Sequence, residues 1–296
     1  MSSFRTLTMF ALSALAAAAQ TTLLTDSFAD GNRTSSPTWY LLSNGSTTNS
    51  ITSQSWAFTA GTVARTITTQ FTPYTMAVGD TVSASFNLTT AAGASFSANN
   101  NAVRFGLFNA NSSFPSADNT TSQTSTTQWG PWTGYWVNSD PSSGTLATNT
   151  GEFRERFSNT GTSMNGPMNG TTGSNQLTTT VSSGTFQATG ATNSTYLYTL
   201  SLTKTSGSTM SLSYTIYNQT SNTTYYTLGA SDSSLSVSTF DTLALQINSP
   251  QSIGGATYTL DNFTVSTVPE PSTYAALLGA AGLALVVWRR RQSSTT

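Results

Sequence analysis

Hydrophobic and polar residues alternate along the middle of the chain, in short segments that polar turns separate. The alternation is clearest over residues 81–88 and 196–202, where nearly every second residue is apolar. A polar turn around Gly207 follows, and residues 210–216 then alternate in the same way. A period of two predicts half-buried β-strands, and two such segments joined by a short turn predict a hairpin.

Shorter stretches rich in β-branched and aromatic residues predict further strands. They lie at residues 55–59, 62–70, 103–109, 134–138, 152–157, 225–228, 240–247 and 258–265. No segment of this central region shows a long period of 3.6 residues. We therefore expect an all-β fold, an antiparallel β-sandwich over residues 20–267, with surface loops at 109–128 and 159–175.

The composition excludes several classes of function. Only 7% of the 296 residues are charged, and the chain has no Cys and no His. Without His it cannot build a Ser-His-Asp triad or a His-based zinc site. Between the two ends, six basic side chains stand against ten acidic ones, a net charge of −4, so no basic surface for nucleic acid is expected.

The first 19 residues predict a secretory signal peptide. Arg5 supplies the positive start, and an apolar segment covers residues 7–15. The small residues Ala17 and Ala19 then precede a cleavage point before Gln20. The alternative is a buried N-terminal helix.

The C-terminal segment combines a proline-flanked acid, an apolar run bounded by aromatic rings, and a basic cluster. In chain order these residues are Pro269, Glu270 and Pro271, then Tyr274 and Trp288, then Arg289, Arg290 and Arg291. As a helix, the apolar run spans roughly 22 Å, less than the ~30 Å hydrocarbon core of a bilayer. Aromatic ends and a basic flank suit the membrane interfaces. The pattern predicts one transmembrane helix that holds the protein temporarily.

This three-part segment resembles the PEP-CTERM sorting signal of Gram-negative bacteria. The resemblance implies export, a transient anchor in the inner membrane, and processing near Pro-Glu-Pro by the membrane protease exosortase. It also implies a final place at the cell surface or in the biofilm matrix, with exopolysaccharide as a partner. The alternative is an ordinary, permanent C-terminal anchor. The chain then divides into a signal peptide (1–19), a β-sandwich (20–267) and a sorting tail (268–296).

Three short motifs in the body resemble the concanavalin A-like, or laminin G-like, jelly rolls of exported bacterial proteins. They are residues 25–31, 103–109 and 260–265. The first and last strands lie side by side in that fold, so the resemblance implies that the two ends of the body are neighbours. An immunoglobulin-like or pectate-lyase-like β fold is the alternative.

Residues 151–157 form the densest group of charges in the body. On a strand, Glu155 shares a face with Phe153 and Phe157, where desolvation would raise its pKa as a general acid requires. The alternative is a cross-strand ion pair or a charge that protects a sheet edge. A glycosidase needs a second carboxylate ~5–9.5 Å away, and no sequence neighbour supplies one. We therefore expect no catalytic residue.

Four large aromatic rings lie within eight residues, at Trp129, Trp132, Tyr135 and Trp136. Flat aromatic faces stack on sugar rings, so this segment is the candidate ligand surface. The alternative is that the rings fill one end of the core.

Three acids would meet if the terminal strands pair: Asp26, Asp30 and Asp261. Carboxylate oxygens of this kind hold calcium, so a structural calcium ion is a weak candidate there. The alternative is turn chemistry at Asp30 and a turn or loop cap at Asp261. We expect no other metal and no cofactor.

Together these features predict a non-enzymatic, exported protein with a structural, adhesive or polysaccharide-binding role. Two alternatives stay open. One is a carbohydrate-active enzyme on the same jelly-roll scaffold, and the other is a permanently anchored structural protein.

Overall fold

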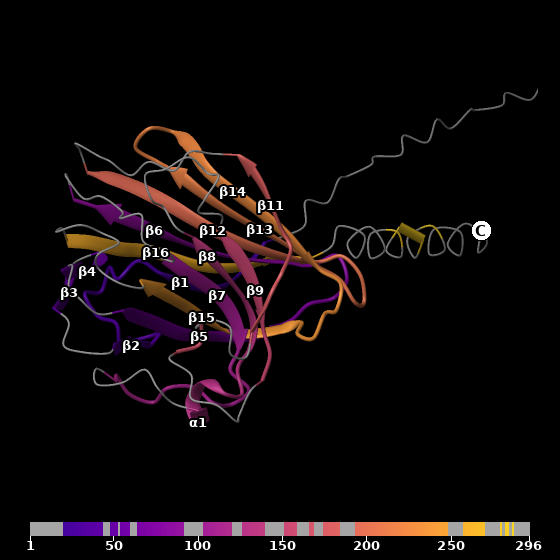
Figure 1. Cartoon of the computed structure of the whole chain (residues 1–296), viewed down its shortest axis with the longest axis horizontal. Helices are drawn as coiled ribbons and strands as arrows, with labels where there is room; N and C mark the ends of the chain where they lie inside the picture. The colour runs from indigo at the N-terminus through magenta and orange to yellow at the C-terminus, as the bar shows by residue number, and fades with distance from the viewer. Residues whose placement is uncertain are drawn as a thin grey trace, which may run out of the picture.

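The computed structural model shows a sandwich of two antiparallel β-sheets (Figure 1). It describes residues 20–43, 48–52, 54–59, 64–91, 103–119, 126–139, 151–158, 166–168, 174–183, 193–247 and 257–269, and four single positions at 279, 282, 283 and 286. The predicted all-β antiparallel sandwich is confirmed.

The first sheet has nine strands, in the order β11-β14-β13-β12-β6-β16-β4-β3, and β1 also pairs with β16. Their bounds are β1 (Thr21–Asp26), β3 (Asn49–Thr52), β4 (Ser55–Thr59), β6 (Thr81–Thr90), β11 (Thr179–Ser183), β12 (Ser194–Lys204), β13 (Met210–Asn218), β14 (Thr223–Asp232) and β16 (Thr257–Val268).

The second sheet has seven strands, in the order β10-β9-β8-β7-β15-β5-β2. Their bounds are β2 (Trp39–Ser43), β5 (Arg65–Thr75), β7 (Val103–Asn109), β8 (Thr133–Ser139), β9 (Glu152–Arg156), β10 (Ser174–Gln176) and β15 (Thr239–Ile247). A four-residue helix, α1 (Thr126–Trp129), precedes β8.

Strict alternation in the first sheet separates an apolar inner face from a hydroxyl-rich outer face. Every second residue of β6 and β12 is buried. Phe86 and Tyr198 face each other across these two strands and stack with their ring centroids 4.8 Å apart. On the outer face, three cross-strand pairs of hydroxyls hydrogen-bond at 2.8–2.9 Å: Thr81–Thr203, Ser83–Ser201 and Thr89–Thr195. The sheet therefore presents short, uncharged, hydrogen-bonded side chains to solvent.

The second sheet is buried on both faces. Nearly every residue of β7 and β8 is buried, which is typical of strands covered on each side. Inward side chains join the core between the sheets, and the opposite face carries a second cluster. We call this the outer cluster; it consists of Leu42, Phe108, Ala110, Trp129, Trp132, Trp136, Met168 and Ala244, with Phe114 packed against it. Segments that connect the strands thus cover the sheet.

The two ends of the body lie side by side. β1 pairs antiparallel with β16, from Thr21 opposite Thr267 to Asp26 opposite Phe263. The side-chain amide of Gln20 donates to the Ser266 hydroxyl at 2.7 Å. This arrangement is the one that the jelly-roll resemblance implies.

The predicted signal peptide, including Ala17 and Ala19, lies outside the described residues. So do Glu270 and Pro271 and the predicted membrane anchor from Tyr274 through Trp288 to Arg289, Arg290 and Arg291, except for four helical positions between 279 and 286. Leu283 and Val286, two of these four, are exposed. Among the residues that the structure describes, no helix is long and apolar enough to cross a membrane.

Candidate functional site

A groove with a volume of about 840 Å³ lies beside β1, near the edge strand β2 of the second sheet. Its apolar surface includes two partly exposed aromatic rings, Tyr40 and Phe114, together with Pro37, Pro115, Phe71, Leu23 and Leu24. Strands β1 and β5 contribute the remaining sides. The groove therefore forms where the terminal strand of one sheet meets the edge of the other.

Hydroxyl and amide groups supply the polar surface of the groove. Thr25, Thr38, Thr72 and Gln70 line it, together with serines from both flanking loops. None of the described lining residues carries a charge. Such a surface suits an uncharged ligand that is rich in hydroxyl groups and has apolar faces.

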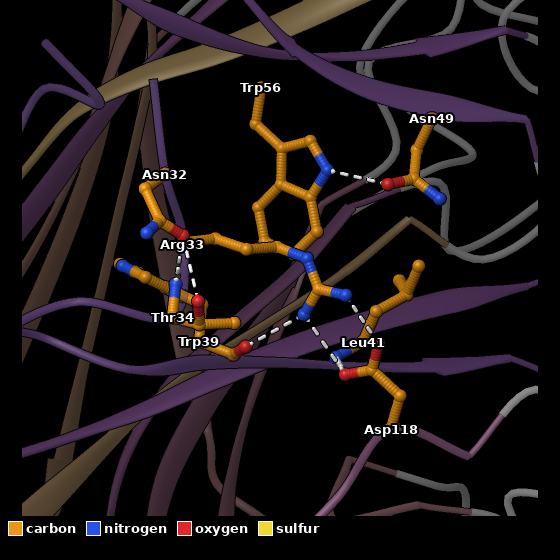
Figure 2. Close-up of polar contacts among 8 residues, drawn as sticks. All are labelled: Asn32, Arg33, Thr34, Trp39, Leu41, Asn49, Trp56 and Asp118. Atoms are coloured by element: carbon orange, nitrogen blue, oxygen red, sulfur yellow. Dashed lines mark hydrogen bonds and ion pairs between the residues drawn. The ribbon is translucent and has the colours of Figure 1, made fainter. Parts of the chain in front are cut away.

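An ion pair joins the two loops that flank the groove, residues 27–38 and 110–119 (Figure 2). Arg33 Nη1 donates to Asp118 Oδ1 at 3.0 Å, and Nη2 donates to Asp118 Oδ2. Nη1 also donates to the Trp39 carbonyl oxygen at 2.9 Å. Because a bidentate Arg–carboxylate pair fixes both distance and orientation, it holds the two loops in one arrangement.

Neighbouring contacts fix this ion pair in turn. The backbone N–H of Leu41 donates to Asp118 Oδ1 at 2.9 Å, which ties the second loop to β2. The guanidinium of Arg33 lies 5.3 Å from the centroid of the Trp56 ring, a cation–π distance. The Trp56 indole N–H donates to Asn49 Oδ1 at 3.1 Å (Figure 2). Arg33 and Asp118 are therefore each held by a further contact in addition to the ion pair.

A carboxylate beside the groove links the two sheets. Asp26 ends β1; its Oδ1 accepts from the Phe28 N–H and its Oδ2 from the Trp39 indole N–H, both at 2.7 Å. Burial raises the pKa of Asp26, while the two hydrogen bonds act in the opposite direction. Since β1 and β2 belong to different sheets, this carboxylate fixes their relative position at the groove.

A tight turn directs the chain into the second flanking loop. The N–H of Ser113 donates to the Ala110 carbonyl oxygen at 2.9 Å, and both central residues, Asn111 and Ser112, have positive φ. Two consecutive residues of this kind define a type I′ turn. After the turn, Phe114 packs on the outer cluster. Packing against the buried outer cluster therefore restrains this side of the groove.

The aromatic surface of the groove continues into the outer cluster. The ring of Phe114 lies parallel to the Trp132 ring, with centroids 6.1 Å apart. The Tyr40 ring meets Phe114 edge-on at 5.6 Å. Tyr40 and Phe114 are each partly exposed, so both offer surface to a ligand.

The four rings predicted as a ligand surface are buried instead. Trp129, Trp132, Tyr135 and Trp136 are each 0–1% exposed, so no ring face is free to stack on a sugar from solution. The prediction of a ligand surface there is wrong, and the alternative of rings that fill the core is nearer to the structure. Tyr135 lies between the sheets, and the three tryptophans belong to the outer cluster.

Arg156 holds this aromatic segment against β9. Its guanidinium donates to the Trp132 carbonyl at 3.1 Å, to the Pro167 carbonyl at 3.0 Å, and to the Trp129 carbonyl. The side chain is fully buried, and burial lowers the pKa of Arg156 to about 10. A buried guanidinium that caps three carbonyls is a structural group, since its donors are directed at backbone.

Glu155 and Phe153 lie on the opposite face of β9, as the sequence predicts, whereas Phe157 follows the strand and is exposed. Burial raises the pKa of its carboxyl; the hydrogen bond from Ser236 lowers it, and the negative charge of Asp232 raises it again. Asp232 accepts from the Tyr135 hydroxyl at 2.7 Å. The structure thus brings a second carboxylate near Glu155, from a residue 77 positions further along the chain, where sequence proximity could not find it.

Neither carboxylate is among the lining residues of the groove. Glu155 and Asp232 are only 5% and 2% exposed. On the other face of β9, Arg154 and Glu152 form an ion pair along the strand, with Arg154 Nε 2.7 Å from Glu152 Oε1. Residues 152–156 therefore serve packing in the described structure.

The three acids proposed for calcium do not form a metal-binding group. Among the described residues, no cluster of three or more His, Cys, Asp or Glu is arranged to hold a metal ion. Asp30 Oδ1 accepts from the Asn32 N–H at 2.9 Å, which is turn chemistry. Asp26 is occupied by its links to Phe28 and Trp39. Burial raises the pKa of Asp261, opposed by hydrogen bonds from Asn87 and Asn262.

The tail begins where the sandwich ends. Thr267 and Val268 still pair with β6, and Thr267 also pairs with Thr21 of β1. Pro269, the first residue of the predicted sorting motif, follows directly and is the first residue outside the ladder. Gln20, the residue after the predicted signal cleavage point, is held near this end of β16 by its hydrogen bond to Ser266.

Comparison with known families identifies the tail. Residues 267–291 match the family model described as PEP-CTERM protein-sorting motif. The chain therefore carries this motif, which indicates an exported protein that exosortase processes at a membrane. A comparison with curated protein sequences finds no match for this chain.

Solved structures with a similar arrangement of strands include lectins and a glucanase. One is lectin I-B4 from Griffonia simplicifolia, with 10% identity, a TM-score of 0.40 and coverage of 77% of this chain and 92% of that one. The basic winged bean lectin has 8% identity, a TM-score of 0.43 and coverage of 84% and 98%. An endo-1,3-beta-glucanase from Streptomyces sioyaensis has 15% identity, a TM-score of 0.41 and coverage of 84% and 97%. At these values the likenesses do not bear on what this chain binds.

The groove itself was not predicted from the sequence. Its two partly exposed rings, Tyr40 and Phe114, are 74 positions apart. Phe114 stands among Ser and Asn, and Tyr40 lies between Trp39 and Leu41 in an apolar segment that predicts burial as readily as a ligand site. One signal was available: Arg33 is the one basic residue of segment 27–38, and Asp118 is the one charged residue of segment 110–119. In a chain with so few charges, an ion pair between them was a reasonable expectation.

Proposed function

We propose that this chain is a non-enzymatic protein of the cell surface or extracellular matrix, delivered by its sorting tail, whose sandwich binds polysaccharide in the groove beside β1. The tail directs the sorting of the protein, and exosortase is the partner that processes the tail. The body is the part that acts after export. Exopolysaccharide is its proposed ligand.

The observation that carries this proposal is the composition of the groove. Tyr40 and Phe114 offer aromatic surface, and Thr38, Gln70 and Thr72 offer hydrogen-bonding groups around it. Sugars present the same combination, because their rings have apolar faces and a periphery of hydroxyls. A site built this way recognises a ligand of that kind by stacking and by several weak hydrogen bonds.

Binding is favoured over hydrolysis by the location of the acids. A glycosidase needs two carboxyl groups about 5–9.5 Å apart on either side of the bond that is cleaved. The described lining of the groove contains no acid, and Glu155 and Asp232, which lie on other strands, are buried. The catalytic alternative therefore has no acid–base pair at the place where a sugar fits.

The hydroxyl-covered outer face of the first sheet supports an extracellular matrix as the working environment. Cross-strand pairs such as Ser83–Ser201 make a surface that is polar without being charged. Such a surface exchanges hydrogen bonds with water and with hydrated polysaccharide at little electrostatic cost. It also offers little to attract polyanions.

The test is polysaccharide binding by the mature protein recovered from exporting cells. Tyr40→Ala removes one ring from the groove, and we expect it to weaken binding roughly tenfold, about 1.4 kcal/mol. The matched control is Tyr217→Ala, which removes a partly exposed tyrosine from β13 of the other sheet. Its affinity should stay within about twofold of the unmodified protein.

Gln70→Ala and Gln219→Ala form a second matched pair. Gln70 lines the groove, whereas Gln219 lies after β13 and bonds Asn87 at 3.3 Å. Thermal unfolding of all four variants establishes that each is folded. Equal binding by the two members of each pair would contradict the groove as the binding site, and polysaccharide turnover by the unmodified protein would contradict the non-enzymatic function.

A further inference from the structure

The charges nearest the groove are each engaged by a partner within the protein. Arg33 is the basic residue of the two flanking loops, and its guanidinium is matched by Asp118 in a bidentate pair and covered by the Trp56 ring. Among the described residues it also donates to the Trp39 carbonyl oxygen. A polyanion in the groove would therefore have to displace Asp118 to reach this cation.

Acidic residues outnumber basic residues in the segments beside the groove. Asp26 and Asp30 lie on the first flanking side, in addition to Asp118. Asp30 is exposed, and hydrogen bonds from the Ser35 hydroxyl and the Asn32 N–H lower the pKa of its carboxyl, so it is charged at neutral pH. Residues 26–38 and 110–119 thus contain three carboxyl groups and one guanidinium. An excess of acidic groups beside the groove disfavours the approach of anions.

The pair of Arg33 and Asp118 also sets the shape of the groove without offering charge to the ligand. It joins the two flanking loops, as Figure 2 shows, while the lining side chains between them are hydroxyls, an amide and aromatic rings. Electrostatic attraction usually selects partners by sign and gives binding that weakens with salt. This groove instead presents uncharged lining residues to a ligand.

We infer that the groove selects neutral polysaccharide and excludes chains that carry uronate, sulfate or phosphate groups. The inference rests on the proposed function, because it names the class of ligand for the same site. Recognition then depends on ring stacking and hydroxyl contacts. Binding should be nearly independent of ionic strength, since no charge pair forms when the ligand arrives.

The experiment compares neutral polysaccharides (dextran, a β-glucan and mannan) with acidic ones (alginate and polygalacturonate), using the mature protein at 20 mM and 500 mM NaCl. We expect at least one neutral chain to bind, with an affinity that changes less than about twofold between the two salt concentrations. The acidic chains should bind at least tenfold more weakly at low salt.

A charge variant tests the mechanism of the selection. Thr72→Arg places a cation among the lining residues of the groove, and Thr224→Arg places one on the exposed start of β14 as the matched control. Thr72→Arg should gain affinity for acidic polysaccharide at 20 mM NaCl and lose that gain at 500 mM. Thr224→Arg should gain several-fold less.

The outcomes separate this inference from the proposed function. Tight, salt-sensitive binding of acidic polysaccharide that Tyr40→Ala abolishes would overturn neutral selection and leave the groove as a binding site. No binding of any polysaccharide would overturn both. Neutral binding that Tyr40→Ala weakens and salt leaves unchanged supports both.

Discussion

At the residue scale, the buried carboxyl groups set how the protein responds to pH. Burial raises the pKa of Glu155 above its ordinary value of 4.5, and the charge of Asp232 adds to this effect. Burial also raises the pKa values of Asp26 and Asp261 above 3.8. A carboxyl whose pKa is raised by folding stabilises the protein below its ordinary pKa, and this contribution is lost as the pH rises through the raised value. Mildly acidic conditions therefore favour the folded body.

Glu155→Gln tests this linkage. The variant keeps an acceptor for Ser236 and cannot ionise, so we expect a higher free energy of unfolding than the unmodified protein at pH 7 and an equal one below pH 4.5. Urea unfolding at a series of pH values measures the difference.

The control for Glu155→Gln is an acid with the opposite shift. Asp30 has a lowered pKa, so its charged form stabilises the fold and Asp30→Asn should not raise stability at pH 7. A Glu155→Gln variant that is less stable than the unmodified protein at pH 7 would mean that the carboxylate is favourably bound and that its pKa is not raised.

At the scale of elements, the second sheet depends on the segments that cover it. The chain between β7 and β8 returns over the sheet's outer face, and its tryptophans complete the outer cluster. Arg156 of β9 joins this cover to the sheet by bonding the carbonyls of Trp129 and Trp132. Phe114, a ring of the groove, rests on the same cluster. The groove and the cover should consequently lose order together.

Arg156→Lys should destabilise the body by about 2–4 kcal/mol, because buried carbonyls lose charge-assisted partners that a lysine cannot replace in the same geometry. Hydrogen exchange should accelerate first around Trp129 and Trp132. The control is Arg33→Lys at a partly exposed pair, for which we expect about 1 kcal/mol or less. Equal losses for the two variants would contradict the role given to Arg156.

The end of strand β16 also limits how much of the C-terminal tail can be removed. β16 stays paired through Val268, and Pro269 has no N–H to extend the ladder. We expect the C-terminus of the processed protein to lie at Val268 or beyond. Mass spectrometry of its C-terminal peptide measures this position, and a terminus before Thr267 would contradict it, since the cut would then fall within a paired strand.

Strands of both sheets were predictable, including residues 103–109 and 134–138 of the sheet that is covered on both faces, but the cover itself was not. Alternation located β6, β12 and β13 because their outer residues meet water. The Trp-rich segment gave no sign of its burial, because a covered outer face and an exposed ligand surface both place aromatic residues there. Tyr40, Phe114 and Asp232 acquire their neighbours only through contacts between distant segments. The sorting motif, which is contiguous, was recognisable from the sequence alone.

At the scale of the whole molecule, the first and last strands of the described body lie side by side. β1 and β16 pair, and the sorting motif begins at the last paired residues. The groove lies beside the same β1. This strand therefore pairs with β16 and also forms one side of the candidate binding site. Removal of the tail leaves every described strand intact.

Sorting by the tail predicts a change of mass that depends on exosortase. The protein recovered from cells with exosortase should lack the segment after the Pro-Glu-Pro motif, and the same protein from cells without it should retain that segment. Intact-mass measurement distinguishes the two. A full-length tail on exported protein from both kinds of cell would show that the motif is not processed.

Hydrogen exchange of the mature protein with and without a neutral polysaccharide tests the central claim most directly. If the groove is the binding site, added polysaccharide should slow exchange in residues 36–41 and 112–117 and leave the outer strands β13 and β14 unchanged. Protection confined to β12, β13 and β14 would place the ligand on the hydroxyl-covered sheet and contradict the groove. No protection anywhere, at concentrations where neutral chains are in excess, would contradict polysaccharide binding itself.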